Sequence, residues 1–360
     1  MASSFKQTQK IILFFIVGAM ILGLVFAFFS DGRQLLEVIH HLELIPLFLA
    51  LLCMGGAYLF LGLSFHVIFK MAHHHIPFWR LFKITFISAT FNYIVSSGGM
   101  STMGVRSFLL KHEKVPYPVS IPMSFAQNMI FNLVLSFVCL GGVIYLRNHR
   151  ELTGDAFQVI VFLCMLGLIG VVTLMVFVFF NRRFRHWFLR HLLNLINGVA
   201  HRFFGQKKPN TKKQKELLSE IEVSVKYLHE GWSRLLLVLL WVTLDWFFTA
   251  LTLYFCFRAA GIHLSFGLLL VGFAVEFLTS TVSVVPGGLG VTEGSLSGVF
   301  KVFGVDFNQT LIAALLFRVI FFFIPLAIST VMYLDTMRTL WKKEVEHKKA
   351  SPKDLPADLS

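Results

Sequence analysis

The sequence alternates between long runs of apolar residues and shorter polar segments. Six runs contain at least 19 residues each, and a helix of about 20 apolar residues crosses the hydrocarbon core of a bilayer. The first run follows two lysines, as a signal peptide does, but its length favours an uncleaved helix. The pattern predicts an all-α polytopic transmembrane bundle with full spans at 11–29, 46–69, 119–146, 157–180, 235–257 and 309–334.

Two further apolar stretches, 81–110 and 264–304, are interrupted by glycine. Gly98-Gly99 breaks the first, and Pro286-Gly287-Gly288 breaks the second. Backbone without helical hydrogen bonds is tolerated at membrane depth only where protein or a wet cavity satisfies it. Each stretch is therefore predicted to form two half-helices in a re-entrant hairpin. The alternative is that the glycines are packing notches between ordinary helices.

Composition excludes a water-soluble domain. Of the 360 residues, 56% are hydrophobic and 14% are charged, and the mean hydropathy is +0.74, whereas soluble domains carry about 25% charged residues. The net charge of +13 would suggest nucleic acid as the partner of a soluble protein, but here the basic residues lie between apolar runs. We therefore expect membrane phospholipids as partners, with anionic headgroups at the cytoplasmic face, and no nucleic acid.

The sequence contains no motif that predicts a cofactor, a metal or a catalytic residue. The run His73-His74-His75 has no cysteine or carboxylate within helical reach, and no P-loop, GxSxG, HExxH or Rossmann fingerprint is present. The four cysteines lie inside apolar runs without CxxC spacing, which argues against a disulfide framework or a zinc site. They are Cys53, Cys139, Cys164 and Cys256.

The distribution of lysine and arginine favours re-entrant hairpins. If both broken stretches re-enter and the N-terminus is cytoplasmic, 26 of these residues lie on the cytoplasmic side and five lie outside. Crossing of the first stretch would instead place the basic segment 181–234 outside. The favoured topology makes 235–334 an inverted copy of 46–146, an arrangement typical of transporters with a site near the midplane. Both termini are then cytoplasmic.

These features predict one integral membrane domain over residues 1–340. A basic amphipathic connector at 181–233 joins the two halves. The basic tail at 341–360 is predicted to be disordered.

Ionisable side chains inside apolar segments are candidates for function, because each costs about 2.5–3.5 kcal/mol on insertion scales. Arg106 and Arg318 offer guanidinium groups suited to a phosphate, and half-helices starting after the glycine breaks would direct backbone N–H groups at the same anion. The carboxylates could hold an amine headgroup or carry a proton. The alternative for each charge is a structural salt bridge. The candidates for substrate binding or translocation are Asn92, Ser97, Gly98, Gly99, Arg106, Asp245, Glu276, Pro286, Gly287, Gly288, Gly290, Glu293 and Arg318.

The segment PGGLGVTEGSLSGVF at 286–300 resembles the hallmark of the lysylphosphatidylglycerol synthase transmembrane-region family, which comprises flippase-like integral membrane proteins. GGMSTMGVRSFLL at 98–110 is similar to the family's earlier motif, although Met103 and Gly104 stand where many relatives carry a Gly-Glu pair. Larger family members fuse this region to a soluble domain that transfers lysine from aminoacyl-tRNA to phosphatidylglycerol, a domain not expected here. The resemblance implies the translocating half of the activity, in the cytoplasmic (inner) membrane of a bacterium.

We therefore expect translocation of a phospholipid or lipid-linked molecule between leaflets, and not an enzyme. The alternatives are a membrane-embedded transferase acting on lipid headgroups, an ion or small-solute channel, and a structural partner subunit. Assembly into a homo-oligomer is compatible with the sequence.

Overall fold

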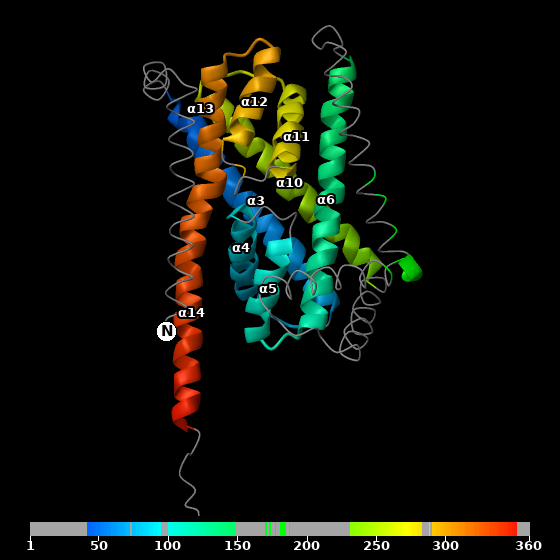
Figure 1. The fold of residues 1–360 in the computed structure, drawn as a ribbon, viewed down its shortest axis with the longest axis vertical. Helices are drawn as coiled ribbons and strands as arrows, with labels where there is room; N and C mark the ends of the chain where they lie inside the picture. The colour runs from blue at the N-terminus through cyan, green and yellow to red at the C-terminus, as the bar shows by residue number, and fades with distance from the viewer. Residues whose placement is uncertain are drawn as a thin grey trace, which may run out of the picture.

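The computed structural model describes residues 42–72, 74–94, 100–148, 231–282, 288 and 290–350, together with 170, 173, 177, 181–184 and 187. The predicted span 11–29 lies outside these residues. Most of the predicted span 157–180 and most of the connector 181–233 lie outside them as well. Within the described part the chain is helical and contains no strand (Figure 1). The predicted all-helical fold class is confirmed for these residues.

The described helices follow one another in two similar series. They are α3 Leu44–Met71, α4 Phe78–Ile94, α5 Met100–His112, α6 Tyr117–Asn148, α10 Trp232–Ala259, α11 Phe266–Val282, α12 Val291–Val302, α13 Phe307–Arg318, the π-helix η3 Val319–Phe323, and α14 Ile324–Ala350. Four helical stretches in the described part are long and apolar enough to cross a membrane, namely Leu44–Met71, Tyr117–Gly142, Ser233–Ala259 and Phe307–Thr339. They coincide with four of the six predicted spans.

Each of the two glycine-containing stretches forms two separate helices in the described residues, as predicted. α4 ends at Ile94 and α5 begins at Met100, α11 ends at Val282 and α12 begins at Val291, and the two helices of each pair pack against each other. A polar contact links each pair. Ser101 Oγ donates to Asn92 Oδ1 at 2.8 Å, and the hydroxyls of Thr279 and Ser295 lie 3.0 Å apart. Each pair is therefore a helical hairpin held partly by polar side chains.

Helix lengths match between the two series. α3 and α10 each contain 28 residues, α4 and α11 each contain 17, and α5 and α12 contain 13 and 12. The turn after the short helix also repeats. The N–H of Val115 donates to the Leu110 carbonyl at 3.1 Å, and the N–H of Val305 donates to the Phe300 carbonyl at 3.0 Å. Both are six-to-one bonds of the kind that ends a helix in a Schellman motif.

The repeated turn supplies a matched stability test. Lys114 has a φ of 64° and its counterpart Gly304 has a φ of 79°, a region in which a Cβ atom crowds the following carbonyl. A Cβ at Gly304 would meet no atom within 4 Å, so substitution there isolates backbone strain. We expect Lys114→Gly to raise the free energy of unfolding by about 1 kcal/mol and Gly304→Ala to lower it by a similar amount. Thermal unfolding in detergent measures both, and unchanged midpoints would contradict strain at these turns.

The two series pack into each other around an antiparallel central pair. The N–H of Glu43, before α3, donates to the carbonyl of Ala259 at the end of α10 at 3.1 Å. The last long helix of each series packs on the first hairpin helix of the other, α6 on α11 and α14 on α4. The hydroxyls of Thr90 and Ser329 join α4 to α14 at 2.7 Å. The hairpins α4–α5 and α11–α12 lie toward opposite ends of the molecule (Figure 1).

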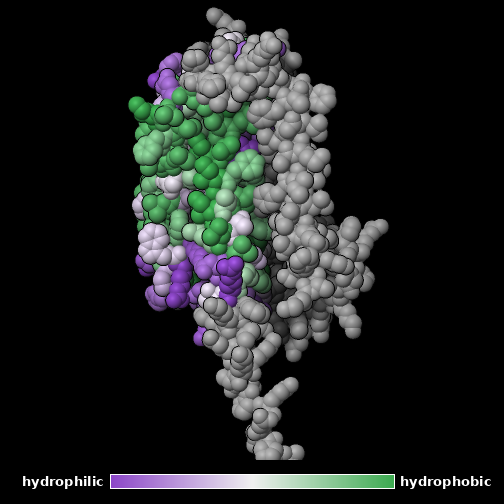
Figure 2. All heavy atoms as spheres, turned by 90° about the vertical axis from the view of Figure 1, so that its left-hand side faces the viewer, coloured by the Kyte–Doolittle hydropathy of each residue, from purple (hydrophilic) through white to green (hydrophobic). Residues whose placement is uncertain are grey.

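The outer surface of the described part is strongly apolar. Ile45, Phe48 and Phe137 are 77%, 61% and 64% exposed. Figure 2 shows a broad hydrophobic band on one face, with hydrophilic residues gathered beneath it. Exposure of this kind is costly in water and favourable against lipid.

The C-terminal segment differs from the prediction. α14 continues to Ala350, so residues 341–350 are helical where composition predicts disorder. The sequence places Lys342 four residues before Glu346, and Glu344 four residues before Lys348, a spacing that supports a helix through i, i+4 charge pairs. Residues 351–360 lie outside the described residues.

Candidate functional site

Glycine and a carboxylate determine where α12 begins. Gly288 and Gly290 have φ values of 62° and 81°, which residues with a Cβ rarely adopt. Oε2 of Glu293 accepts the N–H of Gly290 at 2.8 Å, as an acidic residue at the third helical position does in a capping box. Its negative charge also lies at the positive end of the helix dipole. The second glycine motif therefore starts a half-helix at a defined residue.

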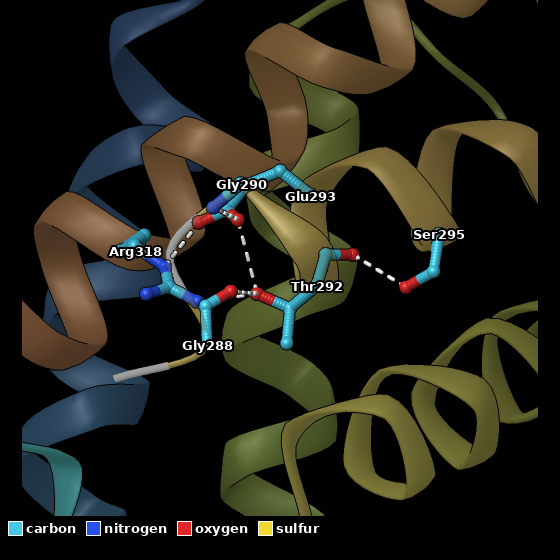
Figure 3. Close-up of polar contacts among 6 residues, drawn as sticks. All are labelled: Gly288, Gly290, Thr292, Glu293, Ser295 and Arg318. Carbon is cyan, nitrogen blue, oxygen red and sulfur yellow. Dashed lines mark hydrogen bonds and ion pairs between the residues drawn. The ribbon is translucent and has the colours of Figure 1, made fainter. Parts of the chain in front are cut away.

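Glu293 and Arg318 form a buried ion pair (Figure 3). Oε1 of Glu293 pairs with Nε of Arg318, and Nη2 of the same guanidinium donates a hydrogen bond to the hydroxyl of Thr292. That hydroxyl lies 3.0 Å from Oε2 of Glu293 and 3.1 Å from the carbonyl oxygen of Gly288. The side chains of Glu293 and Arg318 are only 3% and 10% exposed. The salt-bridge alternative therefore holds for these two candidates.

A π-helix follows Arg318 directly. The guanidinium carbon lies 5.8 Å from the ring centroid of Phe322 in η3. Pro325 has no N–H to offer the Phe321 carbonyl in a regular α-helix, and the Tyr58 hydroxyl donates to that carbonyl at 3.2 Å. A π-turn adds one residue to the helical turn and changes the direction in which preceding side chains point. It therefore sets how Arg318 is oriented relative to α14.

Arg106 is buried in a neutral polar environment. It is 2% exposed, its Nε donates to Ser88 Oγ at 3.2 Å, and its Nη1 donates to Gln127 Oε1 at 2.6 Å. The ring centroid of Phe65 lies 3.9 Å from its guanidinium carbon, within cation–π distance. Among the residues that the structure describes, no carboxylate lies within ion-pair distance of Arg106. Arg106 and Arg318 therefore differ, since only Arg318 has a carboxylate partner in the described part.

The amide of Gln127 holds Arg106 in place. Its Nε2 donates to Ser64 Oγ at 2.6 Å and to the Leu61 carbonyl at 3.1 Å, which fixes the orientation of Oε1 toward Arg106. The network joins side chains of α3, α4, α5 and α6. A guanidinium held from two sides loses little further side-chain freedom on binding a ligand.

The remaining acidic candidates lie in different surroundings. Glu276 of α11 is half-buried and close enough to Arg318 and Glu293 to interact electrostatically with both. Asp245 of α10 is 5% exposed, and its Oδ2 has no hydrogen-bond partner in the described part of the chain. The hydroxyl of Thr249 donates to the Asp245 backbone carbonyl, not to its carboxylate. The structure therefore gathers Glu276, Glu293 and Arg318 into one cluster.

The other candidates flank the helix breaks. Asn92 at the end of α4 accepts a hydrogen bond from Ser101. Gly288 and Gly290 precede α12, as described above. The candidates that lie outside the described residues are Ser97, Gly98, Gly99, Pro286 and Gly287.

Comparison with known proteins identifies the family. A sequence model described as the lysylphosphatidylglycerol synthase TM region matches residues 12–329. The chain belongs to this family. The match includes the segments 98–110 and 286–300, so the resemblance that these motifs predict is confirmed, and the protein is a membrane protein of a lipid-related family.

Curated relatives of this chain are much longer proteins. The phosphatidylglycerol lysyltransferase of Staphylococcus haemolyticus (strain JCSC1435) is 23% identical over 310 residues, which cover 84% of this chain and 30% of that protein. The phosphatidylglycerol lysyltransferase of Staphylococcus aureus (strain MRSA252) is 31% identical over 105 residues, which cover 29% of this chain and 12% of that protein. The chain thus matches less than a third of the length of these relatives.

The sequence did not predict the neutral residues that form hydrogen bonds with the buried charged side chains. Gln127 and Ser88 bind Arg106, and Thr292 bridges Glu293 and Arg318. A signal for Gln127 was present, because it is a polar residue in the apolar run 119–146. Ser88 and Thr292 gave none, since serine and threonine are common in membrane helices.

Proposed function

We propose that the chain moves a phospholipid or a lipid-linked molecule between the leaflets of a bacterial cytoplasmic membrane. The observation that carries this proposal is the buried Arg106, which neutral groups hold in place and which has no carboxylate partner in the described part. An uncompensated charge inside a membrane protein is costly and marks functional sites. A lipid phosphate that reaches Arg106 would supply a counter-ion that the described part of the chain does not provide.

The repeated helices support a transport architecture. Matching lengths, repeated turns and the antiparallel pair α3 and α10 fit an inverted repeat of the halves 46–146 and 235–334. Hairpins at opposite ends of the molecule fit re-entrant loops that enter from opposite sides of the bilayer (Figure 1). Six spans and cytoplasmic termini, which the basic-residue asymmetry predicts, complete the proposed topology.

The second half offers a complementary charge. Glu276, Glu293 and Arg318 together carry one net negative charge when both carboxylates are ionised, which suits an ammonium group. The names of the relatives refer to phosphatidylglycerol and to lysine transfer. Phosphatidylglycerol and its lysylated form are therefore the first lipids to test as cargo.

The test is lipid translocation by the full chain in proteoliposomes. We expect headgroup-labelled phosphatidylglycerol or lysylphosphatidylglycerol to cross rapidly with wild type and about tenfold or more slowly with Arg106→Gln. Lys301→Gln, which removes an exposed cation from the end of α12, should behave as wild type. Dithionite quenching of outer-leaflet label measures the rate.

Other outcomes identify the rival functions. Ion or solute flux without lipid movement would indicate a channel. A chemically altered lipid headgroup, formed in detergent where sidedness has no meaning, would indicate a transferase. Either result without translocation would contradict the proposal.

A further inference from the structure

Three buried hydroxyls of α4, α5 and α6 have no hydrogen-bond partner in the described part of the chain. Thr85, Ser107 and Ser124 are 1%, 3% and 1% exposed, and their hydroxyl oxygens are unpartnered within the described part of the chain. Hydroxyls in helices usually donate to a carbonyl three or four residues earlier, as Ser88 and Thr90 do here. Each of the three therefore retains an unused donor at a buried position, which is costly unless a ligand or water accepts it.

Two of these hydroxyls share a helix face with the groups that bind Arg106. Thr85 precedes Ser88 by three residues on α4, and Ser124 precedes Gln127 by three residues on α6. Residues three apart lie on the same face of a helix, one turn along. Because Ser88 and Gln127 both contact Arg106 of α5, these faces of α4 and α6 are turned toward α5. Ser107 follows Arg106 on α5 itself.

The three hydroxyls also lie at similar depth. Arg80 and Glu113 are 3.4 Å apart and mark the end of the bundle where α4 begins and α5 has ended. At about 1.5 Å per residue, Thr85 and Ser107 lie roughly 8–9 Å from this end, and Ser124, counted from the start of α6, roughly 10 Å. We call these three residues the hydroxyl layer.

The nearby end of the bundle is basic. Two acidic groups at this end, Glu113 and Asp335, are each paired with a cation, Arg80 and Lys83 respectively. The helix ends and turns at this level contribute further cations, Lys70, Lys111 and Lys114. The resulting positive field attracts an anion toward the hydroxyl layer.

The second half carries only part of this arrangement. Counting from the matched turn residues Lys114 and Gly304, Ser107 corresponds to Ser297, which is also buried and unpartnered. By the same count, the counterpart of Ser124 in the second half is Ala314. Counting from the starts of α4 and α11, the counterpart of Thr85 is Phe273. The hydroxyl layer is therefore specific to the first half.

We propose that the hydroxyl layer and Arg106 form a binding site for a phosphate group that enters from the basic end. A phosphate has several acceptor oxygens, so it can satisfy three hydroxyls and a guanidinium at once. The proposal rests on the proposed function insofar as the phosphate belongs to the transported lipid. Free phosphate presents the same chemistry, and the experiment separates the two sources.

The test measures direct binding of lipid and phosphate probes to the full chain in detergent, with tryptophan fluorescence as the readout. The probes are short-chain phosphatidylglycerol, inorganic phosphate and, as a control without phosphate, short-chain diacylglycerol. We expect the variant Thr85→Val/Ser107→Ala/Ser124→Ala to bind phosphatidylglycerol at least about tenfold more weakly than wild type. Ser297→Ala, the matched change in the second half, should bind as wild type.

Binding of phosphatidylglycerol alone would identify a lipid headgroup site, and binding of inorganic phosphate as well would identify a general phosphate site. Wild-type affinity in the triple variant, equal binding of diacylglycerol, or no binding to wild type would overturn the proposal. If the triple variant does not fold, Ser107→Ala against Ser297→Ala provides the same comparison. If wild type binds phosphatidylglycerol but does not translocate it, only the proposed function is contradicted. If the triple variant still translocates lipid at the wild-type rate, only the proposed phosphate site is contradicted.

Discussion

Glu293→Gln is expected to lower the free energy of unfolding by about 3–5 kcal/mol, because it removes one charge of a buried ion pair and leaves the Arg318 cation in the protein interior. The amide keeps the size of the side chain and an oxygen for the N–H of Gly290, so the loss reports the charge. Arg318 is only 10% exposed and cannot recover full hydration. Glu276 remains as a second nearby anion, which favours the lower end of the range. Unfolding titrations in mixed micelles measure the change.

A surface pair provides the matched control. Glu113→Gln breaks the ion pair between Glu113 and Arg80, whose side chains are 32% and 66% exposed, respectively. The free energy of unfolding should fall by less than about 1 kcal/mol. The double variant Glu293→Gln/Arg318→Gln should recover part of the loss, because the Arg318 cation is then removed together with the Glu293 carboxylate. The recovery is partial, since Glu276 loses its neighbouring cation. Equal costs for Glu293→Gln and Glu113→Gln would show that the buried pair does not stabilise the fold.

Local chemistry made much of the fold predictable. Glycine and proline in apolar stretches indicated where α4 and α11 must end, and run length indicated four of the spans that the structure describes. Packing between the halves could not be predicted in this way, because the contacts of α6 with α11 and of α14 with α4 join distant segments. The π-helix after Arg318 was missed for a similar reason, since its stabilising contact comes from Tyr58 on α3.

The candidate site was predictable only in its charges. Arg106, Glu293 and Arg318 were found because ionisable residues are rare in apolar segments. Which charges pair depends on the three-dimensional arrangement, so the sequence alone left the salt bridge and the phosphate ligand as alternatives for both arginines. The hydroxyl layer gave no signal, since serine and threonine in helices usually satisfy themselves.

Arg106→Met is expected to have the opposite effect on stability from Glu293→Gln. The substitution removes a buried charge that has no carboxylate partner in the described part, and methionine can pack against the ring of Phe65. We expect the free energy of unfolding to rise by about 1–3 kcal/mol, while lipid translocation falls about ten- to a hundredfold. Unfolding titrations and the proteoliposome assay on the same preparation measure both quantities.

The combination separates function from structure. A residue retained only for packing would lose stability when replaced, whereas one retained for a ligand can gain stability and lose activity. Arg106→Lys is the informative control, because lysine keeps the charge but not the planar fork that binds Ser88 and Gln127 together. The lipid translocation rate of Arg106→Lys should lie between the rates of wild type and Arg106→Met. Loss of several kcal/mol in Arg106→Met would instead make Arg106 a structural cation and would remove the main support for a phosphate ligand.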